Sequence, residues 1–270
     1  MPGSRFVDRR SGSGGFSLVE LSIVLVILGL LVGGILSGQS LIRAAELRSI
    51  STSIQRYNTA VYTFRDKYFA LPGDMTNATS VWGKDNTNCA GHTGTAATPG
   101  TCNGNGDGRM DNPGAASSTG ETFQFWKQLS LAGLIEGTYS GLAGSGSARH
   151  VNPGVNTPTV KFGPQGGIAM ENRDMPGNTT YCWGGNTGNG YIIGGYAANA
   201  PPEGMIFKPE ELWNIDTKMD DGKPALGNFS TYFRYSYNGN NCVTTDVEST
   251  SEYKLTTTTA ACNIFSLPGF

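Results

Sequence analysis

The chain has 270 residues and a formal net charge of −2, so its charge balance gives no indication of a nucleic-acid-binding surface. Only 15% of the residues are charged, and glycine occupies 39 positions, about twice its average usage. This polar, uncharged, glycine-rich composition is typical of exported surface proteins and is unusual for a cytosolic one.

An apolar stretch near the N-terminus is long enough to cross a membrane. From Leu21 to Leu36 every residue is apolar or glycine except Ser22, and residues 16–36 together form a 21-residue segment. A helix needs about 20 residues to span a bilayer core, so the stretch predicts a transmembrane helix. Glu20 lies inside it, and a carboxylate there costs about 2.5–3.5 kcal/mol on insertion scales, which favours a functional role. The alternative is that Glu20 sits at the membrane interface and extends outward to water.

The residues before this stretch differ from an ordinary secretory signal. Such a signal is cleaved after its apolar region, whereas the small residues Gly14 and Gly15 precede the apolar region here. Three arginines, Arg5, Arg9 and Arg10, also precede it. The positive-inside tendency therefore predicts that residues 1–15 stay in the cytoplasm and that the C-terminal bulk of the chain is exported.

The segment Gly15-Phe16-Ser17-Leu18-Val19-Glu20 resembles the processing site of type IV prepilins and type II secretion pseudopilins. The resemblance implies that prepilin peptidase, which is also the methyltransferase, cleaves after Gly15 and methylates the new amino terminus on Phe16. It also implies that Glu20 is the family's glutamate five residues into the mature chain. Beyond the N-terminal helix, the chain is similar to the family only in its general plan.

The apolar spacing changes after the predicted span, over residues 37–72. One side of a helix is indicated by apolar residues in steps of three and four: Leu47, Ile50, Ile54, Tyr57, Val61, Phe64 and Tyr68. No proline interrupts the segment before Pro72-Gly73, so one helix of about 50 residues is predicted up to Leu71. Its second half is expected to carry the exported domain.

Four glycines lie within the first half of this predicted helix. Gly29 and Gly33, like Gly34 and Gly38, are four residues apart, so helices can approach closely along this face. Glycine also lowers helix stability by about 1 kcal/mol relative to alanine. We therefore expect local unwinding between Gly29 and Gly38 when subunits assemble. The resemblance supports this expectation, since pilin helices are often partly unwound in filaments.

Five cysteines follow the apolar span, and disulfides are expected in an exported domain. Two bridges among five cysteines can be drawn in fifteen ways. Proximity in the sequence favours Cys89–Cys102 and Cys242–Cys262, which leaves Cys182 over. A zinc site is disfavoured, because the chain has no C-x₂-C spacing and only two histidines.

The glycine- and asparagine-rich insertion at residues 74–120 contains a candidate calcium loop. Its oxygen-bearing residues follow the alternating spacing of such loops: Asn103, Asn105, Asp107 and Asp111. The last position of the pattern is Gly114 in place of glutamate, so the alternative is a simple turn rich in asparagine and glycine. Asp216, Asp220 and Asp221 form a second acidic candidate.

The remaining signals predict a second helix followed by short strands. Ser118 and Glu121 fit a capping box, with a helix over residues 122–132 whose apolar face carries Trp126 as a core residue. A short helix is predicted at residues 209–218. Candidate strands are the runs at residues 167–170, 191–193, 205–207, 231–237 and 253–255, with a turn at Asn238-Gly239.

These elements predict an α+β, pilin-like fold: a long N-terminal helix packed on an antiparallel sheet, with a glycine-rich insertion. The predicted domains are a cleaved leader at residues 1–15, a transmembrane and polymerisation helix at 16–36, its amphipathic continuation at 37–72 and an exported head at 73–270. The aromatic run Tyr181-Cys182-Trp183 is interpreted as core, although it also suits a carbohydrate or partner surface.

No nucleophile, phosphate loop or paired-carboxylate motif accompanies these elements, so the sequence favours a protein that is not an enzyme. The expected function is a structural subunit of a type IV pilus or type II secretion pseudopilus; the alternative is a minor or tip pilin that acts as a binding or adhesion module. The expected partners are prepilin peptidase, sister subunits and, before assembly, the bacterial inner membrane. The resemblance implies a single-pass protein with a periplasmic C-terminal domain.

Overall fold

The computed structural model describes residues 15, 17–85, 89, 100–110, 120–145, 147–163, 165–173, 183, 188–232 and 241–270. The chain divides into two compact units, residues 1–45 and residues 46–270. Helix α1 (Leu18–Tyr68, 51 residues) contributes to both units, and each unit is described below by itself.

In the first unit, α1 presents apolar side chains to its surroundings along its whole described length. All large hydrophobic residues from Leu18 to Ile42 are more than half exposed. An 18-residue window of α1 has a mean hydropathy of 2.6, and by length and composition this helix can cross a membrane. The helix continues through Gly29 and Gly38 in this single chain, so the expected unwinding on assembly stays a prediction.

In the second unit, α1 buries the side predicted from its apolar spacing. Ile50, Ile54, Tyr57, Val61 and Phe64 are buried, and Leu47 and Tyr68 pack against the same core. These residues confirm the predicted amphipathic continuation of the helix.

The helix ends at Tyr68, short of the predicted end at Leu71. Phe69 takes a left-handed backbone conformation with φ of 54°, which cannot continue a right-handed helix. The sequence signal at Pro72-Gly73 therefore lies beyond the true terminus.

A four-stranded antiparallel sheet forms the centre of the second unit, in the order β1-β2-β4-β3. Its strands are β1 (Gly167–Asn172), β2 (Asn189–Gly194), β3 (Phe229–Thr231) and β4 (Ile264–Ser266). One face turns Ile168, Tyr191 and Ile264 into the main hydrophobic core, which also contains the buried side of α1. This long helix and antiparallel sheet confirm the predicted α+β, pilin-like fold.

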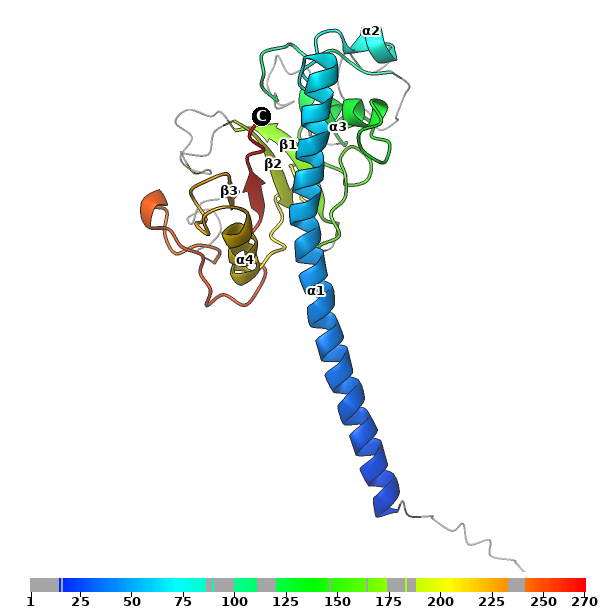
Figure 1. The fold of residues 1–270 in the computed structure, drawn as a ribbon, viewed down its shortest axis with the longest axis vertical. Helices are drawn as coiled ribbons and strands as arrows, with labels where there is room; N and C mark the ends of the chain where they lie inside the picture. Colours follow the sequence, from blue (N-terminus) through cyan, green and yellow to red (C-terminus); the bar gives the residue numbers. More distant parts are fainter. Residues whose placement is uncertain are drawn as a thin grey trace, which may run out of the picture. The chain divides into compact units, whose positions relative to one another are not determined.

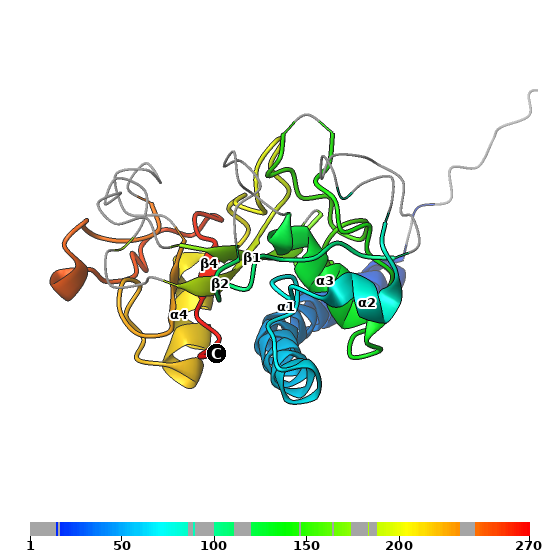
Figure 2. The same cartoon turned by 90° about the horizontal axis from the view of Figure 1, so that it is seen from above.

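Helix α3 (Glu121–Leu131) lies beside α1 and next to the sheet (Figures 1 and 2). Trp126 of α3 is fully buried, as predicted, and its ring meets that of Tyr57 edge to face with centroids 5.0 Å apart. The ring centroid of Tyr191 in β2 lies 6.3 Å from the centroid of the same indole. Aromatic rings from α1, α3 and the sheet thus meet at one point of the core.

The predicted N-cap of α3 was wrong, whereas its predicted apolar face with Trp126 is buried. Its N-cap is Gly120, in a left-handed conformation, so Ser118, which lies outside the described residues, is not the N-cap. The polar side of the helix is buried as well, because every residue from Glu121 to Leu129 is buried. It is an internal helix whose polar side chains face other parts of the unit.

The short helix predicted at residues 209–218 is confirmed as α4 (Pro209–Met219), which packs Leu212 and Ile215 into the main core. The sequence analysis missed α2 (Ala78–Trp82), a five-residue helix inside the predicted insertion. It also missed the short 3₁₀ helix η1 (Glu248–Thr250).

The strand predictions were right for β1 and β2 and largely wrong elsewhere. The runs at residues 205–207 and 253–255 form only isolated bridges, Phe207 with Cys262 and Tyr253 with Val243. The strand predicted at residues 231–237 overlaps β3 only at Thr231, where β3 ends. Residues 233–240, which include the predicted Asn238-Gly239 turn, lie outside the described part. Strand β4 was not predicted, because a three-residue run is too short to show an alternating pattern.

Candidate functional site

The predicted processing site lies at the start of α1. Gly15 is exposed, and Phe16, the predicted methylation site, lies outside the described residues. Ser17 immediately precedes the helix: its hydroxyl oxygen accepts a hydrogen bond from the Val19 amide at 3.1 Å. In return, the Ser17 amide donates to Glu20 Oε2 at 2.8 Å.

These two hydrogen bonds, from the Val19 amide to the Ser17 hydroxyl and from the Ser17 amide to the Glu20 carboxylate, make Glu20 part of a helix N-terminal cap. Ser17 is followed three residues later by Glu20, which is the spacing of a capping box. A carboxylate in the first turn is further stabilised by the partial positive charge of the helix N-terminus. Glu20 was predicted as a charge within an apolar span and, by resemblance, as the family's glutamate; its capping role was not predicted, although the Ser-x-x-Glu spacing was visible. The carboxylate therefore has a partner within its own helix.

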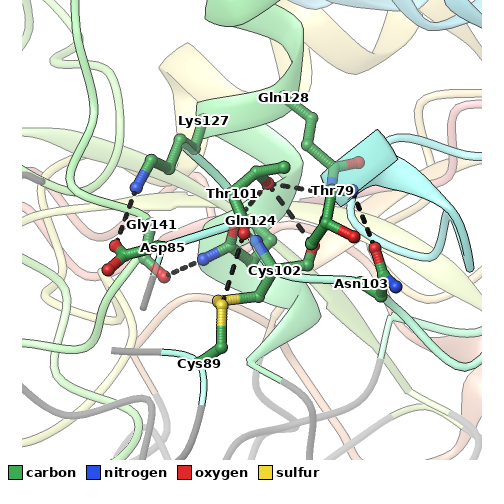
Figure 3. Close-up of a disulfide and its surroundings, with 10 residues drawn as sticks. All are labelled: Thr79, Asp85, Cys89, Thr101, Cys102, Asn103, Gln124, Lys127, Gln128 and Gly141. Carbon is green, nitrogen blue, oxygen red and sulfur yellow. Dashed lines mark hydrogen bonds and ion pairs between the residues drawn. A yellow bond between two sulfur atoms is a disulfide. The ribbon is translucent and has the colours of Figure 1, made fainter. Parts of the chain in front are cut away.

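In the second unit, the disulfide between Cys89 and Cys102 lies against the polar side of α3 (Figure 3). This is one of the two pairs favoured by proximity. Gln124 Oε1 accepts hydrogen bonds from Thr101 Oγ1 at 2.8 Å and from the Cys102 amide at 3.2 Å. Gln124 also donates to the Gly141 carbonyl oxygen at 2.9 Å. A buried amide side chain thus satisfies the backbone of two separate loops.

Gln128, one turn further along α3, has the same function. Its Nε2 donates to the Cys102 carbonyl oxygen at 3.1 Å, and its Oε1 accepts from the Gly73 amide at 2.6 Å. Buried backbone groups need such partners, because each one left without a hydrogen bond costs free energy. These contacts explain why glutamines occupy the interior of the unit.

A buried ion pair lies beside this disulfide. Lys127 Nζ of α3 is 3.3 Å from Asp85 Oδ2, and the two side chains are only 5% and 1% exposed (Figure 3). Removing one member of such a pair typically costs about 3–5 kcal/mol, because the other charge stays buried. The ion pair therefore fixes the backbone near Asp85 to α3.

The predicted calcium loop is folded around two carboxylates that the sequence analysis did not include. Asp74 is 5% exposed, and its two oxygens accept hydrogen bonds from the amides of Gly106 at 2.6 Å and Gly108 at 2.9 Å. Glu121 Oε1 accepts from the Asn105 amide at 2.9 Å. Burial raises the pKa of Asp74, and the two amide donors counteract this increase. Asp74 was not predicted as part of this site, because Gly106 and Gly108 lie more than 30 residues further along the chain and no local sequence pattern connects them with Asp74.

Of the four side chains predicted as calcium ligands, Asp107 joins the acidic cluster, and Asn103 and Asn105 accept hydrogen bonds from backbone amides. Asn103 Oδ1 accepts a hydrogen bond from the Thr79 amide at 2.8 Å, in the first turn of α2. Asn105 Oδ1 accepts from the Asp107 amide at 2.9 Å. Asp111 lies outside the described residues. Carboxylate oxygens of Asp74, Asp107 and Glu121 lie within 4.8 Å of one another, and hard oxygen ligands of this kind suit Ca²⁺.

The second predicted acidic group lies at the end of α4. Carboxylate oxygens of Asp216, Asp220 and Asp221 are also within 4.8 Å of one another. The Tyr253 hydroxyl donates to Asp216 Oδ2 at 2.7 Å, and the Gly222 amide donates to Oδ1 at 3.2 Å. Burial raises the pKa of Asp216 to about 7; the Tyr253 hydrogen bond opposes this shift, and the other two carboxylates add to it.

The remaining predicted site residues lie near the C-terminus of the chain. The structure joins Cys242 to Cys262, the other pair favoured by proximity, and both residues are fully buried. Cys182 and Tyr181 lie outside the described residues. Trp183 is buried, and its indole N–H donates to Thr231 Oγ1 at 2.9 Å, in agreement with its interpretation as a core residue.

The raised pKa of Asp216 predicts a dependence of stability on pH. The folded chain keeps this proton up to a pH of about 7, whereas the unfolded chain releases it near 3.8. The unfolding free energy should therefore fall as the pH rises between these values, by up to about 1.4 kcal/mol per pH unit, and level off above 7. Asp216→Asn should remove this contribution. The measurement is urea unfolding of the full chain in detergent across this pH range.

The exposed carboxylate of Asp66 provides the matched control. The Asp66→Asn variant should keep the pH slope of the unchanged chain. Equal slopes for the unchanged chain and for Asp216→Asn would contradict the assignment of this proton to Asp216.

Comparison with known proteins gives one match, at the N-terminus. Residues 10–36 match the family model of the prokaryotic N-terminal methylation motif. Comparisons with curated proteins and with solved structures give no match. The matched segment contains Gly15, Phe16 and Glu20, and it continues into the apolar half of α1. On residues 10–36 the chain therefore carries the signature of type IV prepilins and pseudopilins.

Proposed function

We propose that the chain is a structural subunit of a filament, either a type IV pilus or a type II secretion pseudopilus. It is cleaved by prepilin peptidase after Gly15, methylated on Phe16 and assembled through its N-terminal helix. The observation that carries the proposal is the methylation motif at residues 10–36, which overlaps the start of a 51-residue helix with exposed apolar side chains. Apolar surface of this extent needs lipid or other helices to cover it.

The same features support a location for the subunit. Before assembly, residues 16–36 cross the inner membrane once and the C-terminal head lies in the periplasm. The arginines of the leader favour this orientation. The two disulfides agree with it, because such bonds persist in oxidising compartments.

Within the filament, Glu20 pairs with the amino group of Phe16 on a neighbouring subunit. Cleavage creates this positive group, so processing itself supplies the partner for a carboxylate in an apolar environment. Within one subunit the carboxylate accepts a hydrogen bond from the Ser17 amide. The pairing between subunits would fix their axial register.

A minor or tip subunit with a binding function is the alternative. The head supports it, because the insertion at residues 74–120 contains an ordered loop that is joined to α3 by hydrogen bonds and a buried ion pair. The two functions differ in stoichiometry. Quantitative mass spectrometry of purified filaments separates a main component from a component present in a few copies per filament.

The processing step can be tested at Gly15. Gly15→Val should leave the precursor at full length, because the peptidase requires glycine at the cleavage position, as the resemblance implies. Gly12→Val, the same change three residues earlier, should be cleaved normally. Intact-mass measurement of the membrane fraction shows both cleavage and methylation. Mature protein carrying a methylated Phe16 in the Gly15→Val strain would contradict the proposed processing site.

Two substitutions separate the charge of Glu20 from its capping role. Glu20→Gln keeps an oxygen that can accept from the Ser17 amide, whereas Glu20→Ala loses both the cap and the charge. Both variants should be cleaved, and both should lower filament yield by at least about tenfold, because each leaves the Phe16 amine of the neighbouring subunit without a counter-charge. Immunoblots of sheared filaments measure the yield. Normal filaments with Glu20→Gln would refute the ion pair and leave only the capping function.

Calcium binding by the loop at residues 103–108 also stays a proposal. The convergence of Asp74, Asp107 and Glu121 supports it. Calorimetric titration of the full chain in detergent with Ca²⁺ should give a saturable heat. Asp107 is exposed, so Asp107→Asn should abolish the heat without unfolding the head, while Glu210→Gln, also exposed and on α4, should leave it unchanged. Absence of heat in the unchanged chain would end the proposal.

A further inference from the structure

The head contains a pocket whose described lining residues do not include the loop at residues 103–108. It has a volume of about 410 Å³ and is lined by Asn152, Pro153, Thr159, Gln165 and Tyr196. This volume lies within the range of small-ligand pockets, about 300–1,000 Å³. All five lining residues are neutral. The site adjoins the sheet, because Pro153 packs so closely on Gly167, the first residue of β1, that a Cβ there would lie 2.7 Å from the proline ring.

One wall of this pocket is held rigidly by a buried asparagine. Asn156 is 1% exposed, and its Oδ1 accepts a hydrogen bond from the Asn152 amide at 2.7 Å. Its Nδ2 donates to the carbonyl oxygens of Leu142 and His150, both at 3.0 Å. The backbone that carries Asn152 and Pro153 is therefore fixed before any ligand arrives, which lowers the entropic cost of binding.

The hydroxyl group of Tyr196 is oriented by a buried histidine. His150 Nδ1 lies 2.7 Å from the Ser145 carbonyl oxygen, which can only accept, so Nδ1 carries the hydrogen. In the neutral ring Nε2 is then an acceptor, and the Tyr196 hydroxyl, 3.1 Å away, donates to it. The lone pairs of this hydroxyl stay available to accept from a ligand, beside an aromatic ring that is 39% exposed.

Gln165 lies in the pocket wall with an unfavourable backbone conformation. Its φ of 53° is in the left-handed region, where glycine is the least strained residue. Its side chain is exposed and forms no part of a hydrophobic core, so packing does not compensate for the strain. Strained residues of this kind tend to cluster at ligand sites. In the part of the chain that the structure describes, the side chains of Asn152, Thr159 and Gln165 take part in no hydrogen bond.

We propose that this pocket binds a neutral sugar unit. Amide and hydroxyl side chains both donate and accept, which matches sugar hydroxyl groups, and the Tyr196 ring suits the C–H face of a pyranose. A charged ligand would find no counter-charge among the lining residues that the structure describes. A purely apolar ligand would leave the amides without partners. The site goes beyond the filament role, and it does not depend on whether the chain assembles.

The test uses the full-length chain in a zwitterionic detergent without a sugar headgroup, because glycoside detergents would compete. Saturation-transfer NMR is recorded with glucose, galactose, mannose and N-acetylglucosamine, and with glucuronic acid as the charged analogue. At least one neutral sugar should receive saturation, and glucuronic acid should bind more weakly than glucose. Tyr196→Ala should abolish the signal, and Tyr196→Phe should lower affinity about 2- to 10-fold, the effect of one hydrogen bond.

Gln165→Gly provides a variant that tests binding without endangering the fold. It removes the amide and relieves the left-handed backbone, so the thermal midpoint should stay equal or rise while affinity falls about 2- to 10-fold. Asn199 is also exposed and left-handed, with φ of 61°, and does not line the pocket. Asn199→Gly should therefore keep full sugar binding.

Three results would overturn the proposal. The first is that none of the four neutral sugars receives saturation from the unchanged chain. The second is that the signal persists unchanged in Gln165→Gly and Tyr196→Ala, which would place the sugar elsewhere on the protein. The third is tighter binding of glucuronic acid than of glucose, which would contradict the neutral character of the site.

Discussion

The contact between the indole of Trp126 and the rings of Tyr57 and Tyr191 is the point on which the second unit depends. It joins α1, α3 and the sheet in one aromatic cluster, with the Tyr57 and Trp126 centroids 5.0 Å apart. Pairs of this geometry contribute about 0.5–1.5 kcal/mol beyond the apolar area that they bury. Through Tyr57 this cluster fastens the sheet to α1, whose residues 18–36 belong to the matched methylation motif.

Helix α3 extends this attachment to the loops. Its aromatic side faces the core, while Gln124, Lys127 and Gln128 reach backbone and carboxylate groups of the segments at residues 73–102. Irregular backbone needs such partners when it is buried, because it has no ladder of its own. The Cys89–Cys102 disulfide secures the same region covalently. The described parts of the insertion around Asp85, Cys102 and Asn105 are therefore held by an internal helix, although the glycine-rich composition alone indicated a loop.

The sequence predicted the parts of the fold that depend on local periodicity or local chemistry. The stripe from Ile50 to Phe64 is one helix face, and Pro209 marks the start of α4 at its first position. Burial of α3 on all sides was not predictable in this way, because its glutamines and lysine resemble a solvent-facing side. Asp74 was missed at the acidic cluster for a related reason: its partners Gly106 and Gly108 are distant in sequence, and only the tertiary fold brings them together.

If the chain assembles as we propose, the cap formed by Ser17 and Glu20 also affects polymerisation. Within one chain, the Glu20 carboxylate already accepts a hydrogen bond from the amide of Ser17, which immediately precedes the helix. A neighbouring amine must compete with this internal donor, so the net gain on joining a filament is the difference between two hydrogen-bonded states. In the proposed filament, such an exchange would make the addition of a subunit easier to reverse until further contacts form. In the proposed filament, the cap would hold the Glu20 carboxylate in a hydrogen-bonded state until the amine of a neighbouring subunit replaces the Ser17 amide. Correct register would then depend on exchanging one hydrogen-bond donor for another.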